Sequence, residues 1–176
     1  MGEEVNSGSL GFVSFEPDNG GFRAFLSVGA ALDSESDPED LARQAAAVYA
    51  RLLGKMRSAV EEIDALRRTR TPVSARRVWQ LGDLVFRLTR GLAELDLELD
   101  GVYEHLSRDL NVKRKWLEKV IILRRYIEDV SLIPESLNWG RVEKGTARAA
   151  RRISEGLQHN GSDTVERGGE NRTRGS

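Results

Sequence analysis

A long amphipathic segment in the first half of the chain is the feature that most constrains the fold. Short polar residues from Asp33 to Asp37 precede Pro38, a combination typical of the start of an α-helix. Beyond it, apolar residues recur at steps of three or four for about seven turns. Such a helix cannot bury its stripe alone, so it packs in a helical hairpin or in a two-chain coiled coil. The stripe consists of Leu41, Ala45, Val48, Leu52, Met56, Ala59, Ile63 and Leu66.

A second helix follows a break in this pattern. Alanines in the first stripe and a stutter in its spacing favour packing within one chain. The run from Arg67 to Pro72 ends the first helix, and Ser74 or Thr71 is suited to cap a second one beginning near Val73. These segments predict a mainly α fold, a helical bundle with a long N-terminal helix. The second apolar face consists of Val78, Leu81, Leu84, Val85, Leu88 and Leu92.

Residues 10–28 alternate in the manner of two short strands around a turn from Pro17 to Gly21. We expect a short β-hairpin, with a mobile glycine-rich arm as the alternative. A two-stranded hairpin is barely stable alone, so it must pack on the helices or on a second subunit. Its apolar positions are Phe12, Phe22, Phe25 and Val28.

Three regions follow from these patterns. Residues 1–36 form an N-terminal arm or hairpin, and residues 37–157 form the helical domain. Residues 158–176 contain almost no apolar side chains and are expected to be a disordered tail. The chain has no cysteine and two histidines, which excludes a disulfide framework and cysteine-based metal or thiol chemistry.

Residues 102–120 match the pattern of a helix-turn-helix. Leu106 is the large apolar residue of the first helix, and Ser107 is the small one after it. Asn111 stands where the turn needs a left-handed backbone, and Val112 follows as an apolar plug. Leu117 and Val120 are then expected on the buried side of the second helix.

The positions of the second helix that packing does not use are mostly cationic. Lysine and arginine on such a helix can contact guanine edges or phosphates, and a glutamate can accept from a cytosine amino group. A solvated helix face is the plainer explanation, but four cations against one anion favour nucleic acid. These residues are Lys113, Arg114, Lys115, Glu118 and Lys119.

A second basic feature lies downstream, where Trp139 and Gly140 are predicted to open a helix. Its cations share one face, while Val142, Ala149 and Ile153 dock the other face on the body of the protein. We expect the cations to contact phosphates. They are Arg141, Lys144, Arg148, Arg151 and Arg152, and Arg124 and Arg125 are expected either to extend the surface between the two features or to cap the end of the second helix of the helix-turn-helix.

Charge is distributed unevenly along the chain, although the net charge is −1. Residues 1–66 contain 5 Lys and Arg against 12 Asp and Glu, whereas residues 111–152 contain 11 against 5. A polyanionic partner is therefore expected on the C-terminal third.

The chain resembles the helix-turn-helix superfamily over about residues 100–125. A weaker resemblance, to the helical N-terminal domain of the YhcG family of nucleases, covers residues 75–152. It involves Trp79 to Gly82, Leu106 to Leu110, the helix from Leu117 to Tyr126, and Leu137 to Gly140. Leucine stands at position 81, where that family has isoleucine, and no nuclease domain follows. The resemblance therefore implies DNA binding without cleavage.

The sequence thus predicts a cytoplasmic DNA-binding protein, either a transcriptional regulator or a genome-maintenance accessory factor. A non-catalytic helical adaptor or structural protein in a larger assembly is the alternative. We expect double-stranded DNA as the partner, and a homodimer formed through the 37–68 helix or the hairpin. No cofactor, metal or membrane interaction is expected, and no spacing of catalytic residues indicates an enzyme.

Overall fold

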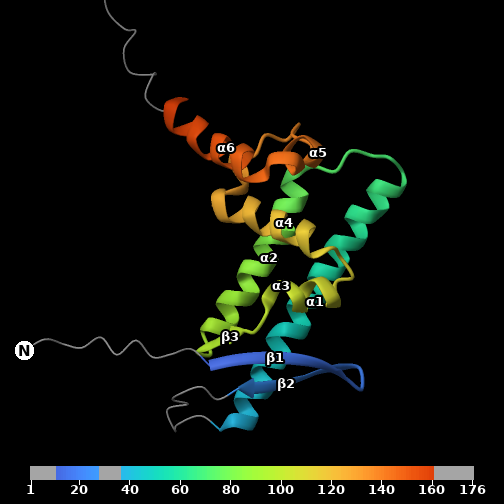
Figure 1. The fold of residues 1–176 in the computed structure, drawn as a ribbon, viewed down its shortest axis with the longest axis vertical. Helices are drawn as coiled ribbons and strands as arrows, with labels where there is room; N and C mark the ends of the chain where they lie inside the picture. Colours follow the sequence, from blue (N-terminus) through green and yellow to red (C-terminus); the bar gives the residue numbers. More distant parts are fainter. Residues whose placement is uncertain (1–10, 28–36, 161–176) are drawn as a thin grey trace, which may run out of the picture.

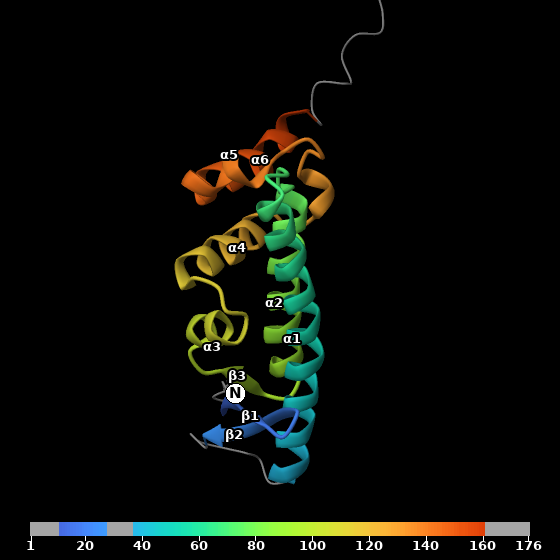
Figure 2. The ribbon, with the colours of Figure 1, turned by 90° about the vertical axis from the view of Figure 1, so that its right-hand side faces the viewer.

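The computed structural model describes residues 11–27 and 37–160, which form a mainly helical fold with a small sheet at one end (Figure 1). A long antiparallel pair of helices forms the spine, and Figure 2 shows α3 and α4 on one side of this pair. No helix in the described ranges is long and apolar enough to cross a bilayer. In chain order, the elements are β1 (Gly11–Asp18), β2 (Gly21–Ser27), α1 (Pro38–Arg68), α2 (Ala75–Ala93), β3 (Leu97–Leu99), α3 (Val102–Asp109), α4 (Arg114–Tyr126), η1 (Val130–Leu132), α5 (Trp139–Val142), η2 (Glu143–Gly145) and α6 (Thr146–Asn160).

The spine begins as the sequence predicts. The Asp37 side chain accepts from the Glu39 N–H at 3.1 Å, and the Ser74 side chain caps α2 through the Arg76 N–H at 3.2 Å. The buried face of α1 is wider than one heptad stripe, because α2 and the sheet both pack on the helix. Val48, Ala59 and Leu66 of the predicted stripe are only partly buried. The buried set is Leu41, Ala45, Tyr49, Leu52, Leu53, Met56, Val60 and Ile63.

The predicted hairpin is present, and β1 also pairs in parallel with β3, a strand that sequence reasoning missed. The strand order is β2-β1-β3. Val13 and Phe15 of β1 are fully buried in the core that the helices share, and the Phe15 ring stacks on Tyr49 with 4.1 Å between centroids. Phe12 and Phe25 face away from the core and are each 43% exposed. Val28 lies outside the described residues.

A polar cluster joins the sheet, α1 and α3. The buried Tyr49 hydroxyl donates to Asp109 Oδ2 at 2.5 Å, and Arg108 Nε donates to the same carboxylate at 2.7 Å. Burial and the hydrogen bond to Asp109 raise the pKa of Tyr49 above its ordinary value. Burial alone would raise the pKa of Asp109, but hydrogen bonds from Arg108 and Tyr49 outweigh it and hold that pKa below its ordinary value. The cluster therefore keeps a neutral tyrosine against an ionised carboxylate.

α4 crosses α2 at Gly82, and α6 packs on α4. A Cβ built on Gly82 would lie 2.8 Å from the Val120 carbonyl oxygen, so only glycine allows this approach.

The predicted helix that opens at Trp139 is not continuous. α5 ends at Val142, a 3₁₀ turn follows, and α6 begins at Thr146, whose buried hydroxyl donates to the Val142 carbonyl at 3.3 Å. Val142 is buried as predicted, but Ala150 is the fully buried residue of α6, while Ala149 and Ile153 are only partly buried. α6 also continues to Asn160, so residues 158–160, assigned to the tail, are helical. The rest of that tail, 161–176, lies outside the described residues.

Candidate nucleic-acid interface

α3 and α4 are two helices joined by a tight turn, in which Asn111 has the left-handed backbone that the sequence predicts. Asn111 has a φ of 52°, and the Val112 N–H donates to the Ser107 carbonyl at 3.0 Å, which closes the end of α3. Leu106 and Leu117 are fully buried. The turn thus fixes where the first residues of α4 emerge.

The left-handed backbone at Asn111 gives a direct test of this turn. Its side chain is exposed, so substitutions there report on the backbone conformation. We expect Asn111→Gly to leave stability almost unchanged and Asn111→Val to lower the free energy of unfolding by about 1–2 kcal/mol. Urea unfolding followed by circular dichroism measures both. Equal stabilities of the two variants would contradict the assignment.

The cations at the start of α4 differ in their exposure and in their ion pairs. Lys113, its N-cap residue, and Lys115 are exposed, and Lys119 is half-buried. Arg114 is exposed but forms ion pairs with Glu104 of α3 and, at 2.8 Å, with Glu118. Because Arg114 pairs with both Glu104 and Glu118, the three lysines are the cations of the predicted recognition surface that have no ion pair among the described residues.

Arg124 does not lie on the open surface that the sequence analysis assigned to it. Its guanidinium donates to Asp83 at 2.9 Å and lies over the rings of Trp79 and Phe86 at 4.8 Å and 4.9 Å. Its side chain is 19% exposed, so it acts as a packing and ion-pairing group between α4 and α2. Arg125 is exposed.

The downstream cations are all exposed, but they come from three short elements and not from one helix face. Arg141 lies in α5 and Lys144 in η2, while Arg148, Arg151 and Arg152 lie in α6. The Arg151 guanidinium lies 5.7 Å from the centre of the Tyr126 ring at the end of α4. This contact places α6 against the C-terminal end of α4, the helix whose start carries the first predicted basic feature.

The connection between α1 and α2 adds a third basic segment, which sequence reasoning treated only as a break. The Arg67 guanidinium lies 5.0 Å from the centre of the Trp116 ring in the first turn of α4, and Asp64 pairs with Arg67 at 3.5 Å. Arg68 and Arg70 beside it are exposed.

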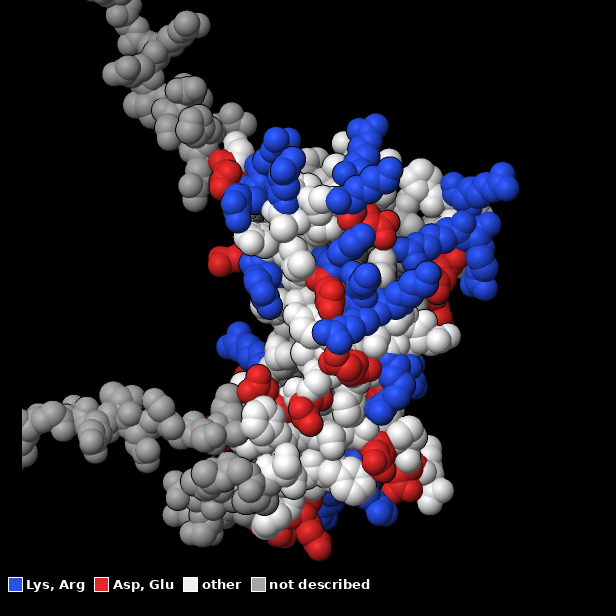
Figure 3. Space-filling view, viewed as in Figure 1, with Lys and Arg blue, Asp and Glu red and all other residues white. Residues whose placement is uncertain are grey.

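Figure 3 shows Lys and Arg gathered over the end of the molecule where the α1–α2 connection, α4 and α6 lie. In the sequence, the arginines at positions 67, 68 and 70 were the signal that could have identified this third basic segment. We call these exposed cations the basic end: Arg67, Arg68, Arg70, Lys113, Lys115, Arg125, Arg141, Lys144, Arg148, Arg151 and Arg152.

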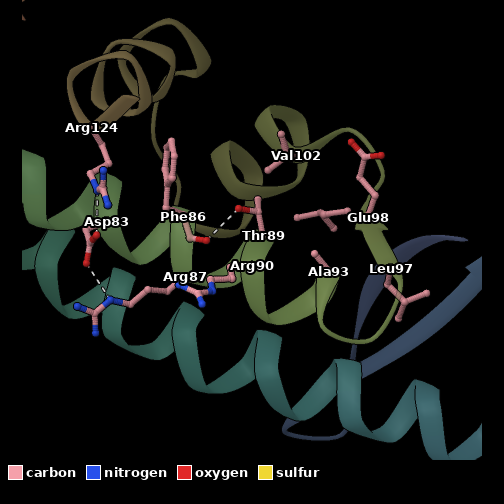
Figure 4. Close-up of a pocket in the computed structure, with 11 residues that line it drawn as sticks. Asp83, Phe86, Arg87, Thr89, Arg90, Ala93, Leu97, Glu98, Val102 and Arg124 are labelled. Carbon is pink, nitrogen blue, oxygen red and sulfur yellow. Dashed lines mark hydrogen bonds and ion pairs between the residues drawn. The ribbon is translucent and has the colours of Figure 1, made fainter. Parts of the chain in front are cut away.

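A groove of about 580 Å³ lies between α2, β3, α3 and α4 (Figure 4). At one end, Asp83 accepts from Arg87 at 2.8 Å and from Arg124 at 2.9 Å, while Leu97 and Val102 line the other end. The single carboxylate of Asp83 is thus shared between two guanidinium groups. Within residues 11–27 and 37–160, no cluster of His, Asp or Glu has the grouping of a metal site.

Comparisons of the chain with protein-family models, with curated proteins and with solved structures find no match. The resemblances to the helix-turn-helix superfamily and to the YhcG family therefore stay predictions.

Proposed function

We propose that this chain binds double-stranded DNA through the basic end. The observation that carries the proposal is the convergence of three basic segments, distant in sequence, on the start and the end of α4. The Arg67–Trp116 and Arg151–Tyr126 contacts hold two of these segments against it. Clustered cations on one face are the electrostatic signature of a surface that neutralises phosphates.

The start of α4 supports the same proposal. Its N-cap residue is Lys113, no side chain caps the helix, and its first turn contains no acid. Among the described hydrogen bonds, none uses the N–H groups of Arg114 and Lys115. Most helices place short polar or acidic residues here to satisfy these donors and the helix dipole. Free N–H groups beside lysines suit a phosphate oxygen.

Recognition of specific bases by α4 requires more than the phosphate contacts proposed above. With Arg114 and Glu118 paired to each other, the cations at the start of α4 that have no ion pair among the described residues are Lys113, Lys115 and Lys119. Phosphate contacts position a protein without reading sequence. We therefore infer binding dominated by the backbone, as in an accessory or architectural factor, with a transcriptional regulator as the narrower reading.

Electrophoretic shift of labelled random duplex and single-stranded DNA across a salt series tests this function. We expect a shift of duplex at low salt, and a log–log slope of affinity against salt of about −0.9 for each phosphate contacted. Absence of any shift at low salt would contradict DNA binding. A protein partner captured in its place would favour the adaptor alternative, in which the acidic residues 1–66 of one chain meet the basic end of another.

A further inference from the structure

The β-hairpin presents an unpaired strand edge at the end of the molecule opposite α6 (Figure 1). β2 pairs with β1 on one side, and on its other side no strand within the described ranges pairs with it. This end is separate from the basic end, so the inference drawn from it is independent of DNA binding.

The main-chain groups that point outward from β2 follow from the register. Pro17, which has no N–H, stands opposite Phe22, and Phe15 stands opposite Ala24. The Phe15 N–H donates to His105 Nε2 at 3.1 Å, so Phe15 turns its main chain away from β2. Antiparallel pairs alternate between bonded and non-bonded, so both pairs are non-bonded ones. The N–H and C=O groups of Phe22, Ala24 and Leu26 therefore point out of the sheet.

The side chains at this edge are also incompletely buried. Phe22, Ala24 and Leu26 face α1 but are only partly buried, whereas their neighbours Val13 and Phe15 on β1 are 0% exposed. On the other face, Phe12 and Phe25 are exposed. Natural edge strands are usually protected by charged side chains, proline or a bulge. β2 has no proline, its register with β1 is unbroken, and its one charged side chain is that of Arg23.

We propose that β2 pairs antiparallel with β2 of a second copy of this chain, with the two-fold axis at Ala24. In this register, Phe22 lies opposite Leu26 of the second copy, and all outward N–H and C=O groups of the three residues find partners. Arg23 lies opposite the Phe25 ring of the second copy, a favourable cation–aromatic pair. Moving the register by two residues toward the turn would place Arg23 opposite Arg23, and like charges directly opposite are destabilising.

A second copy fits this edge better than an unrelated strand because the edge is complementary to itself. One small residue lies on the axis and apolar residues flank it on both sides, as an isologous interface requires. The other predicted dimer surface, the stripe of α1, is already buried within the chain by α2 and the sheet. The pairing joins two three-stranded sheets into one and leaves the two basic ends free.

Sedimentation equilibrium of the full chain tests the proposal. We expect twice the mass of one chain, and a single-chain mass for Ala24→Pro, which removes an outward N–H that pairing with β1 does not use. Circular dichroism and thermal unfolding verify that this variant stays folded. Arg23→Gln removes the cation that faces the Phe25 ring of the second copy and is expected to weaken association about tenfold, because the two-fold axis repeats the pair. It also removes the Arg23–Asp18 ion pair of the hairpin, so circular dichroism verifies its fold as well. Arg51→Gln, the same change at an exposed position of α1, is expected to leave association unchanged.

A single-chain mass for the unaltered protein at all concentrations would overturn the proposal, and so would a folded Ala24→Pro variant that remains a dimer. If Ala24→Pro unfolds, the Arg23→Gln and Arg51→Gln variants decide between the outcomes. Equal association of these two variants would overturn the proposal, and selective weakening by a folded Arg23→Gln variant would support it.

Discussion

Replacing Gly82 by alanine is expected to lower the free energy of unfolding by about 2 kcal/mol. The new Cβ would lie 2.8 Å from the Val120 carbonyl oxygen and 2.9 Å from Arg124 Cβ. Neither atom is the end of a flexible side chain, so α2 and α4 must separate. That separation also strains the Asp83–Arg124 pair. Alanine has a higher helix propensity than glycine, so helix propensity alone would raise the stability. A loss of stability therefore indicates the close approach of α2 and α4 at Gly82.

Gly54 supplies the matched control, because it lies within α1 and a Cβ there would meet nothing within 4 Å. We expect Gly54→Ala to raise the free energy of unfolding by up to about 1 kcal/mol. Urea unfolding of both variants measures the two opposite signs. A Gly82→Ala variant as stable as Gly54→Ala would mean that the α2–α4 crossing is wrong.

Changing Lys113, Lys115 and Lys119 together to glutamine is expected to weaken duplex binding by about 10²-fold to 10³-fold near 0.1 M salt. This figure follows from three phosphate contacts, each of which changes the salt slope by about 0.9. The slope itself should become shallower by about 2.7. Fluorescence anisotropy with a labelled duplex across a salt series measures both quantities.

A triple variant of α1 controls for total charge. Arg43, Arg51 and Lys55 are exposed, and their change to glutamine removes the same charge away from the basic end. We expect it to change the affinity little and to leave the slope unaltered. If the two triple variants weaken binding equally, α4 is not the contact surface and only the overall charge matters. Circular dichroism must show that both remain folded.

Local signals in the sequence predicted the parts of the fold that depend on neighbouring residues. The caps at Asp37 and Ser74, the left-handed Asn111 and the hairpin turn all belong to this class. β3 was missed because it has only three residues and depends on pairing with β1. The break between α5 and α6 was missed because charge spacing continues through Gly145.

The candidate interface shows the same division between local and distant contacts. Exposure of Lys113 and Lys115 follows from the helical period and was predictable. The partner of Arg124 was not, because Asp83 lies 41 positions away in the sequence. The contribution of Arg67 depends equally on a distant ring, that of Trp116. A sequence pattern shows which side chains leave a helix on one face, but not which distant group neutralises them.

The parallel pairing of β1 with β3 has a consequence for how the chain folds. β1 cannot complete its pairing until Leu97 to Leu99 have been synthesised, because α1 and α2 lie between β1 and β3 in the sequence. A two-stranded hairpin has little stability alone, and β1 has no β3 to pair with while α1 and α2 are being synthesised. We therefore expect closure of the sheet to be a late folding step that depends on contacts distant in sequence, after local helix formation. A nascent chain that ends before β3 would leave the Gly11 N–H and the Val13 carbonyl, which bond to Asp96 and Asp100 in the complete fold, without these partners.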